Sequence, residues 1–83
     1  MKAEIDSNCI VTETEKAYLI KVPGANYAFW HPKRFCEIKG KNGYLLSIWF
    51  GDGFTGKFFK HETKTKVAVG EMPLEEVLED YLV

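Results

Sequence analysis

In the stretch YLLSIWFGDGFTGKFFK (residues 44–60), two apolar, aromatic-rich segments flank the loop sequence GDG. Segments of this kind separated by a glycine-containing loop are typical of a β-hairpin. A three-residue loop would pair Phe50 with Phe54, whereas a two-residue loop would pair Phe50 with Thr55 and mix oily and polar side chains on both faces. Only the three-residue loop keeps apolar and polar side chains on separate faces, so it is favoured. In this loop Gly53 is free to adopt a positive φ.

This register divides the side chains of the predicted hairpin between two faces. One face is apolar, and we expect it to form the core: Tyr44, Leu46, Ile48, Phe50, Phe54 and Phe58. The other face mixes aromatic, polar and basic side chains: Leu45, Ser47, Trp49, Thr55, Lys57 and Phe59. Trp49 and Phe59 are thus predicted to lie beside Lys57 on a face that the core does not use.

Most of the remaining chain also indicates short strands separated by turn residues. Proline, glycine and asparagine interrupt the strand pattern at residues 23–26 and 42–43. The further β-rich segments are residues 9–14, 16–22, 27–30, 34–39 and 65–69. We therefore predict a small antiparallel sheet of about five strands within residues 1–70.

The pattern becomes helical at the C-terminal end of the chain, in residues 73–82. Apolar residues recur there at helical spacing and acidic residues occupy the other side: Leu74, Val77, Leu78, Tyr81 and Leu82 against Glu75, Glu76, Glu79 and Asp80. Pro73 suits the first position of a helix, because the N–H that proline lacks would have no partner there. An isolated helix of about ten residues is unstable in water, so it must pack on the sheet. The predicted fold class is α+β, mostly β, with this helix packed on one face.

The length of the chain limits it to a single domain, because 83 residues cannot enclose two separate cores. No run of about 18 apolar residues occurs, so no segment is expected to span a membrane. The N-terminal sequence MKAEIDSNC lacks the apolar core of a signal peptide. We therefore expect one domain, residues 1–83, that resides in the cytoplasm.

The net charge of −1 conceals three regions of different charge. Residues 1–15 sum to −3, residues 16–66 to +7 and residues 67–83 to −5. Such asymmetry indicates a surface that binds a polyanion. The alternative is that the acidic ends fold back and neutralise the basic middle at short range.

The chain has two cysteines, Cys9 and Cys36, and two histidines, His31 and His61. In an intracellular chain, cysteines within strand-like sequence are usually reduced and buried. The four side chains could supply zinc ligands, but no Cys-x2-Cys or His-x3-His pair anchors such a site. We therefore expect no metal, no cofactor and no disulfide.

The sequence contains no recognisable catalytic motif. No nucleophile elbow is present, and Ser7 and Ser47 have no nearby His-Asp context. The sequence GDGFTG (residues 51–56) matches the dinucleotide-binding pattern G-x-G-x-x-G, but it lies in a predicted hairpin rather than between a strand and a helix. The acidic pairs of the C-terminal segment are expected to face solvent. We therefore expect a protein that is not an enzyme.

The remaining functional signal is a set of aromatic residues interleaved with cations, which is densest in YAFWHPKRF (residues 27–35). An aromatic ring on a sheet can stack on an unpaired base, which is worth about 1–3 kcal/mol, while neighbouring lysines and arginines attract the phosphates. The candidate binding residues are Trp30, His31, Lys33, Arg34, Trp49, Lys57, Phe59, Lys64 and Lys66.

A structural role is the alternative for each aromatic candidate. Aromatic residues make up 14% of the chain, and a small domain buries most of them. We expect Phe29 and Phe35 in the core, while the turn that follows Trp30 could cover its ring. The exposure of Trp49 depends on the hairpin register, and His31 could serve only to cap the turn with a hydrogen bond.

The segments AYLIKVPGANYAFWHPKRF (residues 17–35) and LLSIWFGDGFTGKFFK (residues 45–60) resemble small uncharacterised proteins encoded by phages and integrative elements of Gram-positive bacteria. The shared features are an apolar strand that ends in a basic residue and proline, a FWHP segment followed by bases, and a later aromatic hairpin. Mobile elements encode many small DNA-binding accessories and many inhibitors of host defence, so the resemblance implies one of these settings.

The predicted order of elements, an antiparallel sheet followed by a C-terminal helix, also resembles the PC4-like single-stranded-DNA-binding fold. Together these patterns lead to the hypothesis of a non-enzymatic nucleic-acid-binding accessory protein that prefers single strands. The alternative hypothesis is a protein-binding module, such as an inhibitor of a host or defence protein of the anti-defence or anti-CRISPR type. In that case the aromatic and basic residues form the hot spot of an interface, where Trp, Tyr and Arg are enriched.

Overall fold

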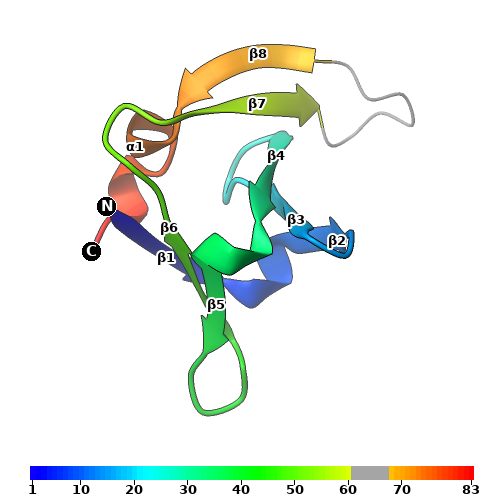
Figure 1. Ribbon diagram of the computed structural model, residues 1–83, viewed down its shortest axis with the longest axis vertical. Coiled ribbons are helices and arrows are strands. Elements are labelled where there is room, and N and C mark those ends of the chain that lie inside the picture. Colours follow the sequence, from blue (N-terminus) through cyan, green and yellow to red (C-terminus); the bar gives the residue numbers. More distant parts are fainter. Residues whose placement is uncertain (61–67) are drawn as a thin grey trace.

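The computed structural model describes residues 1–60 and 68–83 of the chain. These residues form a mostly β fold of the predicted α+β class, with eight strands and a short C-terminal helix (Figure 1). The strands are β1 (Lys2–Asp6), β2 (Ile10–Glu13), β3 (Ala17–Lys21), β4 (Tyr27–Pro32), β5 (Cys36–Lys39), β6 (Leu45–Trp49), β7 (Thr55–Lys60) and β8 (Ala68–Pro73). The helical elements are α1 (Leu74–Val77) and three 3-10 turns, η1 (Ser7–Cys9), η2 (Lys33–Phe35) and η3 (Glu79–Tyr81).

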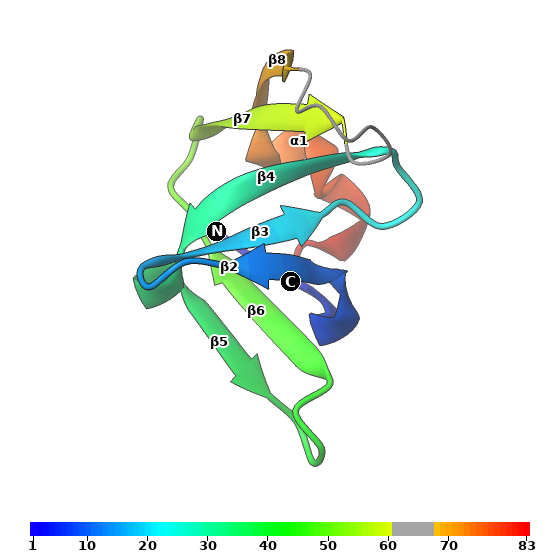
Figure 2. The same cartoon turned by 90° about the vertical axis from the view of Figure 1, so that its right-hand side faces the viewer.

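The strands pair in two antiparallel sheets, so the prediction of one sheet is wrong. The smaller sheet has the order β1-β6-β5 and the larger one has the order β2-β3-β4-β7-β8 (Figure 2). The chain crosses from one sheet to the other at η1, at η2 and at the GDG loop. Residues of both sheets belong to one hydrophobic core. The two sheets therefore pack on each other across that core.

The predicted hairpin between residues 44–50 and 54–60 is also wrong. Strand β6 pairs with β1 and β5, whereas β7 pairs with β4 and β8. The GDG loop does form a turn, in which the N–H of Phe54 donates to the carbonyl of Gly51 at 3.1 Å and Gly53 has a φ of 72°. The positive φ predicted for Gly53 is thus confirmed, but the turn carries the chain into the second sheet.

The predicted division of side chains between core and surface is largely confirmed despite the different pairing. Leu46, Ile48, Phe50 and Phe58 are buried. The alternation of apolar residues within a strand sets which face is buried, whichever strand is its partner. Three residues differ from the prediction: 63% of Tyr44 and 42% of Phe54 are exposed, and Ser47, which was expected on the other face, is fully buried.

The core is built from cross-strand pairs of apolar residues in each sheet. In the smaller sheet, Ala3 lies opposite Ile48. In the larger sheet, Phe29 lies between Ile20 on β3 and Phe58 on β7. The rings of Phe29 and Phe58 have centroids 5.2 Å apart. Strand β1 was not predicted. Its only apolar residues are Ala3 and Ile5, and two such positions between charged residues are too short a pattern to indicate a strand.

The C-terminal segment packs against the core as predicted, but its helix is shorter than residues 73–82. Pro73 ends strand β8 and precedes α1, and the helical turns are interrupted at Leu78, where φ is −104° and ψ is 21°. Leu74 and Leu78 are fully buried. The N–H of Val83 donates to the carbonyl of Lys2 at 2.9 Å, which ties the end of the chain to β1.

The other predicted strands agree with the structure within a few residues, except where 3-10 turns replace strand ends. Residues 9 and 34–35 belong to η1 and η2 instead of to strands. The predicted last strand, residues 65–69, overlaps β8 at residues 68–69, and residues 65–67 lie outside the described part of the chain. Among the described residues, no helix is long and apolar enough to cross a membrane.

Candidate functional site

The face of the larger sheet that points away from the core carries three of the predicted binding residues. Trp30 lies opposite Leu19 of β3, and Phe59 lies opposite Ala28 of β4. Because side chains alternate along a strand, Trp30 shares the face of Ala28, and Lys57 shares the face of Phe59. Trp30, Lys57 and Phe59 therefore lie on one face, which we call the outer face.

The core cluster lies on the other side of these strands, although Leu19 and Ala28 of the outer face are also buried. The alternate residues of the same strands, Phe29, His31 and Phe58, are fully buried on the core side. On the outer face, Trp30 and Phe59 are half-buried and Lys57 is exposed. Lys21, which lies opposite Ala28, adds a further cation to this face.

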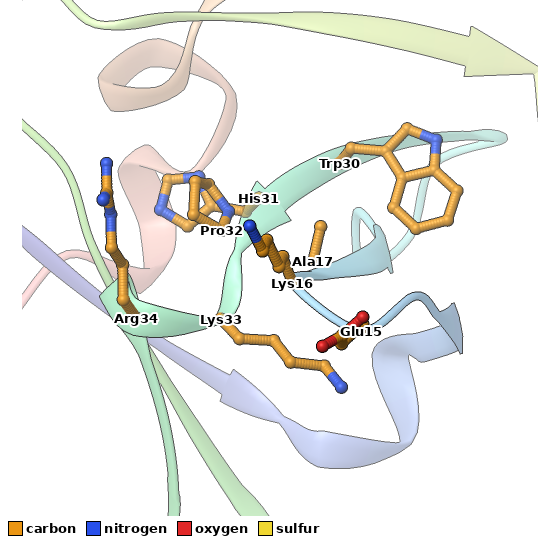
Figure 3. Close-up of a pocket in the computed structure, with 8 residues that line it drawn as sticks. All are labelled: Glu15, Lys16, Ala17, Trp30, His31, Pro32, Lys33 and Arg34. Carbon is orange, nitrogen blue, oxygen red and sulfur yellow. The ribbon is translucent and has the colours of Figure 1, made fainter.

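One end of the outer face opens into a pocket of about 780 Å³ (Figure 3). Its lining consists of Glu15, Lys16, Ala17, Trp30, His31, Pro32, Lys33 and Arg34. In Figure 3, Trp30 and Arg34 stand at opposite ends of this group, and Lys16 and Pro32 lie between them. The pocket thus places an aromatic wall and three cations around one cavity.

Short backbone contacts fix the two segments that build the pocket. The N–H of Thr14 donates to the carbonyl of Ala17 at 2.8 Å, which closes the turn between β2 and β3. The N–H of Lys33 donates to the carbonyl of Lys16 at 2.8 Å, which joins that turn to η2. Pro32, with its fixed φ, ends β4 immediately before the chain turns. These bonds bring Lys16 and the basic pair Lys33-Arg34 together.

The cations of the pocket have different surroundings. The ammonium of Lys33 forms an ion pair with Glu13 and lies 5.0 Å from the ring centroid of Tyr18. The guanidinium of Arg34 lies 4.9 Å from the ring centroid of Phe35. Both side chains are thereby directed by neighbouring groups, while their charges remain at the surface.

His31 also belongs to the pocket lining, but its imidazole is only 1% exposed and points to the opposite side of β4 from Trp30 (Figure 3). Nε2 donates a hydrogen bond to the carbonyl oxygen of Trp49 at 2.8 Å, and Nδ1 has no partner among the described residues. Burial lowers the pKa of His31, which the bond to Trp49 partly opposes. The prediction that this side chain binds a ligand is therefore replaced by a structural role, because the neutral ring joins β4 to β6.

Trp49 points away from the core as predicted, but it lies on the smaller sheet, apart from the strand of Lys57 and Phe59. Its ring centroid is 5.7 Å from the ammonium of Lys2 and 5.8 Å from that of Lys39. The predicted grouping of Trp49 with Lys57 and Phe59 is wrong, because β6 and β7 do not pair.

The surroundings of Trp49 form a polar network on the outside of the smaller sheet. The hydroxyl of Ser47 donates to Glu4 at 3.0 Å, and the ammonium of Lys39 lies 3.4 Å from the same carboxylate. The hydrogen bond from Ser47 is the main cause that lowers the pKa of Glu4. The ammonium of Lys39 beside Trp49 thus has an ionic partner on its own sheet.

Several other predicted residues fall outside the candidate site or outside the described residues. Phe35 was expected in the core, but 43% of it is exposed because η2 turns it outward. Lys64 and Lys66, like His61, lie outside the described part of the chain. Sequence reasoning missed Lys16 and Lys21, although their places just before and within an apolar strand were a signal that could have found them.

Within the described residues, the two cysteines have the surroundings of ordinary partly buried thiols. Cys9 and Cys36 are free and half-buried. Burial raises the pKa of Cys9, and it raises that of Cys36 to about 11, so both are thiols at neutral pH. Within residues 1–60 and 68–83, no three His, Cys, Asp or Glu side chains gather as metal ligands would.

Comparison of the chain with models of known protein families, with curated proteins and with solved structures finds no match. A function for this chain must therefore be argued from the site itself. The feature that best supports such an argument is the combination of Trp30, the outer face and the basic pocket.

Proposed function

We propose that this protein is a small non-enzymatic nucleic-acid-binding accessory protein of a mobile element, and that it prefers single strands. The observation that supports this function best is the position of Trp30. Its ring is on the same sheet face as Phe59, and it lines a pocket together with Lys16, Lys33 and Arg34.

The two aromatic rings supply stacking platforms for bases. Trp30 on β4 and Phe59 on β7 lie on neighbouring strands of the larger sheet, with their rings on the outer face. Stacking of a base on an aromatic ring contributes about 1–3 kcal/mol and tolerates any base. Such contacts require an unstacked base, which a duplex does not offer. The arrangement therefore favours single strands with little preference for sequence.

The cations of the same surface supply contacts to phosphates. Lys16 and Arg34 line the pocket, and Lys21 and Lys57 lie on the outer face. Lys33 is paired with Glu13, but an exposed ion pair is worth only about 0–1 kcal/mol and yields readily to a phosphate. About four phosphate contacts would give a slope near −3 in a plot of log affinity against log salt concentration.

A protein-binding module remains the second candidate, because one observation favours it. Phe35 and Phe54 are 43% and 42% exposed, and both rings lie close to buried His31, with centroids 6.2 Å and 5.7 Å from it. Arg34 lies over Phe35. Exposed aromatic rings combined with arginine are typical of interface hot spots. In this role the protein would act as an inhibitor of a host or defence protein.

Binding of a labelled single-stranded oligonucleotide, measured by fluorescence anisotropy, distinguishes the two candidates. We expect micromolar binding at about 50 mM salt, weaker binding of the duplex, and about 50-fold loss at about 200 mM salt. Trp30→Ala should weaken binding by about tenfold. The matched control is Tyr44→Ala, because that ring is 63% exposed and lies outside the outer face and the pocket.

Absence of binding at the lower salt concentration would reject the nucleic-acid function. Equal weakening by Trp30→Ala and Tyr44→Ala would reject the proposed site. If no nucleic acid binds, loss of a partner from a host lysate on Phe35→Ala would support the protein-binding alternative.

A further inference from the structure

Positive charge on the outer face is concentrated at the pocket. Three cations line the pocket against one lining carboxylate, that of Glu15, and one of the three, Lys33, is paired with Glu13 beside the pocket. Elsewhere on the described part of this face the charge is sparser, because Lys57 lies opposite Glu71 of β8. A ligand group with more than one negative charge would therefore find its best partners in the pocket.

The pocket also lies where the outer face ends. Ala17 and Pro32 form the last pair of the β3–β4 ladder, and both line the pocket. Beyond them the chain leaves the sheet at the Thr14–Ala17 turn and at η2, which the bond between Lys33 and Lys16 holds together. A nucleic acid strand that follows β4 across the outer face thus reaches the end of the sheet at the pocket.

We infer that the pocket binds the phosphorylated end of a nucleic acid strand, with the terminal base stacked on Trp30 and the phosphate monoester held by Lys16 and Arg34. This inference rests on the function proposed above. A phosphate monoester carries about −1.5 to −2 charges at neutral pH, whereas each bridging phosphate carries about −1. The guanidinium of Arg34 can hold two oxygens of a terminal phosphate at once.

The size of the expected preference follows from the additional charge. One further unit of charge at about 4 Å from a cation in water changes an equilibrium constant by about fivefold. The same strand with hydroxyl ends can place only a bridging phosphate in the pocket, so a strand with a phosphate at the correct end should bind up to about fivefold more tightly. Thymidine 5′-monophosphate shares this chemistry and tests whether a free nucleotide is sufficient.

The experiment measures displacement of an internally labelled oligothymidylate by unlabelled competitors. The competitors are one oligothymidylate with a 5′-phosphate, a 3′-phosphate or hydroxyl ends, and thymidine 5′-monophosphate. We expect one phosphorylated end to compete up to about fivefold better than the hydroxyl ends. Arg34→Gln should remove this difference, whereas Lys21→Gln, on the outer face, should weaken all oligonucleotides by the same factor. Effective competition by the monophosphate alone would show that the pocket also takes free nucleotides.

Equal competition by all three kinds of end would overturn the inference while leaving the proposed function intact. The inference is also overturned, with the proposed function intact, if Arg34→Gln weakens binding of all three oligothymidylates by the same factor. If the labelled oligothymidylate itself does not bind, the proposed function fails. A titration of the ¹⁵N-labelled protein then tests whether the pocket binds a phosphate monoester on its own. A shift of the Trp30 indole signal with thymidine 5′-monophosphate but not with thymidine would retain a phosphate monoester site for free nucleotides, and no shift would reject it.

Discussion

Replacing His31 by alanine should destabilise the protein by about 3–5 kcal/mol, because this side chain connects the two sheets. The substitution leaves the part-buried carbonyl of Trp49 without its donor, which costs about 1–3 kcal/mol. It also removes the ring contacts with Phe29 and Phe54 and leaves a cavity, and truncation of a large buried side chain costs about 2–5 kcal/mol. A domain is usually stable by only about 5–15 kcal/mol, so the loss is easy to measure.

Urea unfolding followed by circular dichroism measures this loss. His31→Phe is the matched control, because it fills the space of the ring but lacks the donor, and it should cost about 1–3 kcal/mol. The difference between the two variants then reports the cavity. A cost below about 1 kcal/mol for His31→Ala would refute the structural role of the imidazole.

The same residue should make stability depend on pH. Burial lowers the pKa of His31 in the folded protein below the unfolded value of about 6.5. The unfolded chain therefore binds more protons as the pH falls below that value, so this contribution to stability is full above about pH 6.5 and decreases on acidification through the folded pKa. His31→Phe should lack this part of the pH dependence, and an unchanged pH profile in that variant would contradict the assignment.

Three further predictions concern the core and the absence of a metal. Deleting residues 73–83 should abolish cooperative unfolding, because Leu74 and Leu78 are fully buried in the core; a truncated chain with a sharp melting transition would contradict this. Ile48→Ala should cost about 2–5 kcal/mol, and Trp49→Ala, which removes cation–π contacts on a half-exposed face, about 1–2 kcal/mol. The reverse order in a denaturant titration would mean that the faces of β6 are assigned wrongly. EDTA should leave the melting temperature unchanged, and a decrease would reveal a bound metal.

The fold class and the buried faces could be predicted because they depend on alternation within single segments. Ile48 and Phe58 were placed in the core correctly although their strands belong to different sheets. The pairing of strands could not be predicted, because the GDG turn has the length and glycines of a hairpin loop but joins strands of two different sheets. Strand β1, which was not predicted, pairs with β6 along the edge where β7 was expected. Because that edge is occupied, β7 pairs in the other sheet.

The candidate site was predictable to a similar extent. Trp30, Lys33 and Arg34 are neighbours in the sequence, so local reasoning grouped them correctly, and they line one pocket. Trp49 was grouped with Phe59 only because the two were assigned to one hairpin. That hairpin does not form, so Trp49 does not belong to the outer face. The burial of His31 was missed because a single histidine before a proline has no pattern that shows whether a second sheet will cover it.

The most direct test of the central claim follows the indole N–H signals of the two tryptophans by NMR while a single-stranded oligothymidylate is added. Stacking of a base on Trp30 should shift its indole signal in proportion to the bound fraction and leave the Trp49 signal, on the smaller sheet, in place. A shift confined to Trp49, or no shift of either signal at concentrations where anisotropy shows binding, would contradict recognition through Trp30 and the outer face.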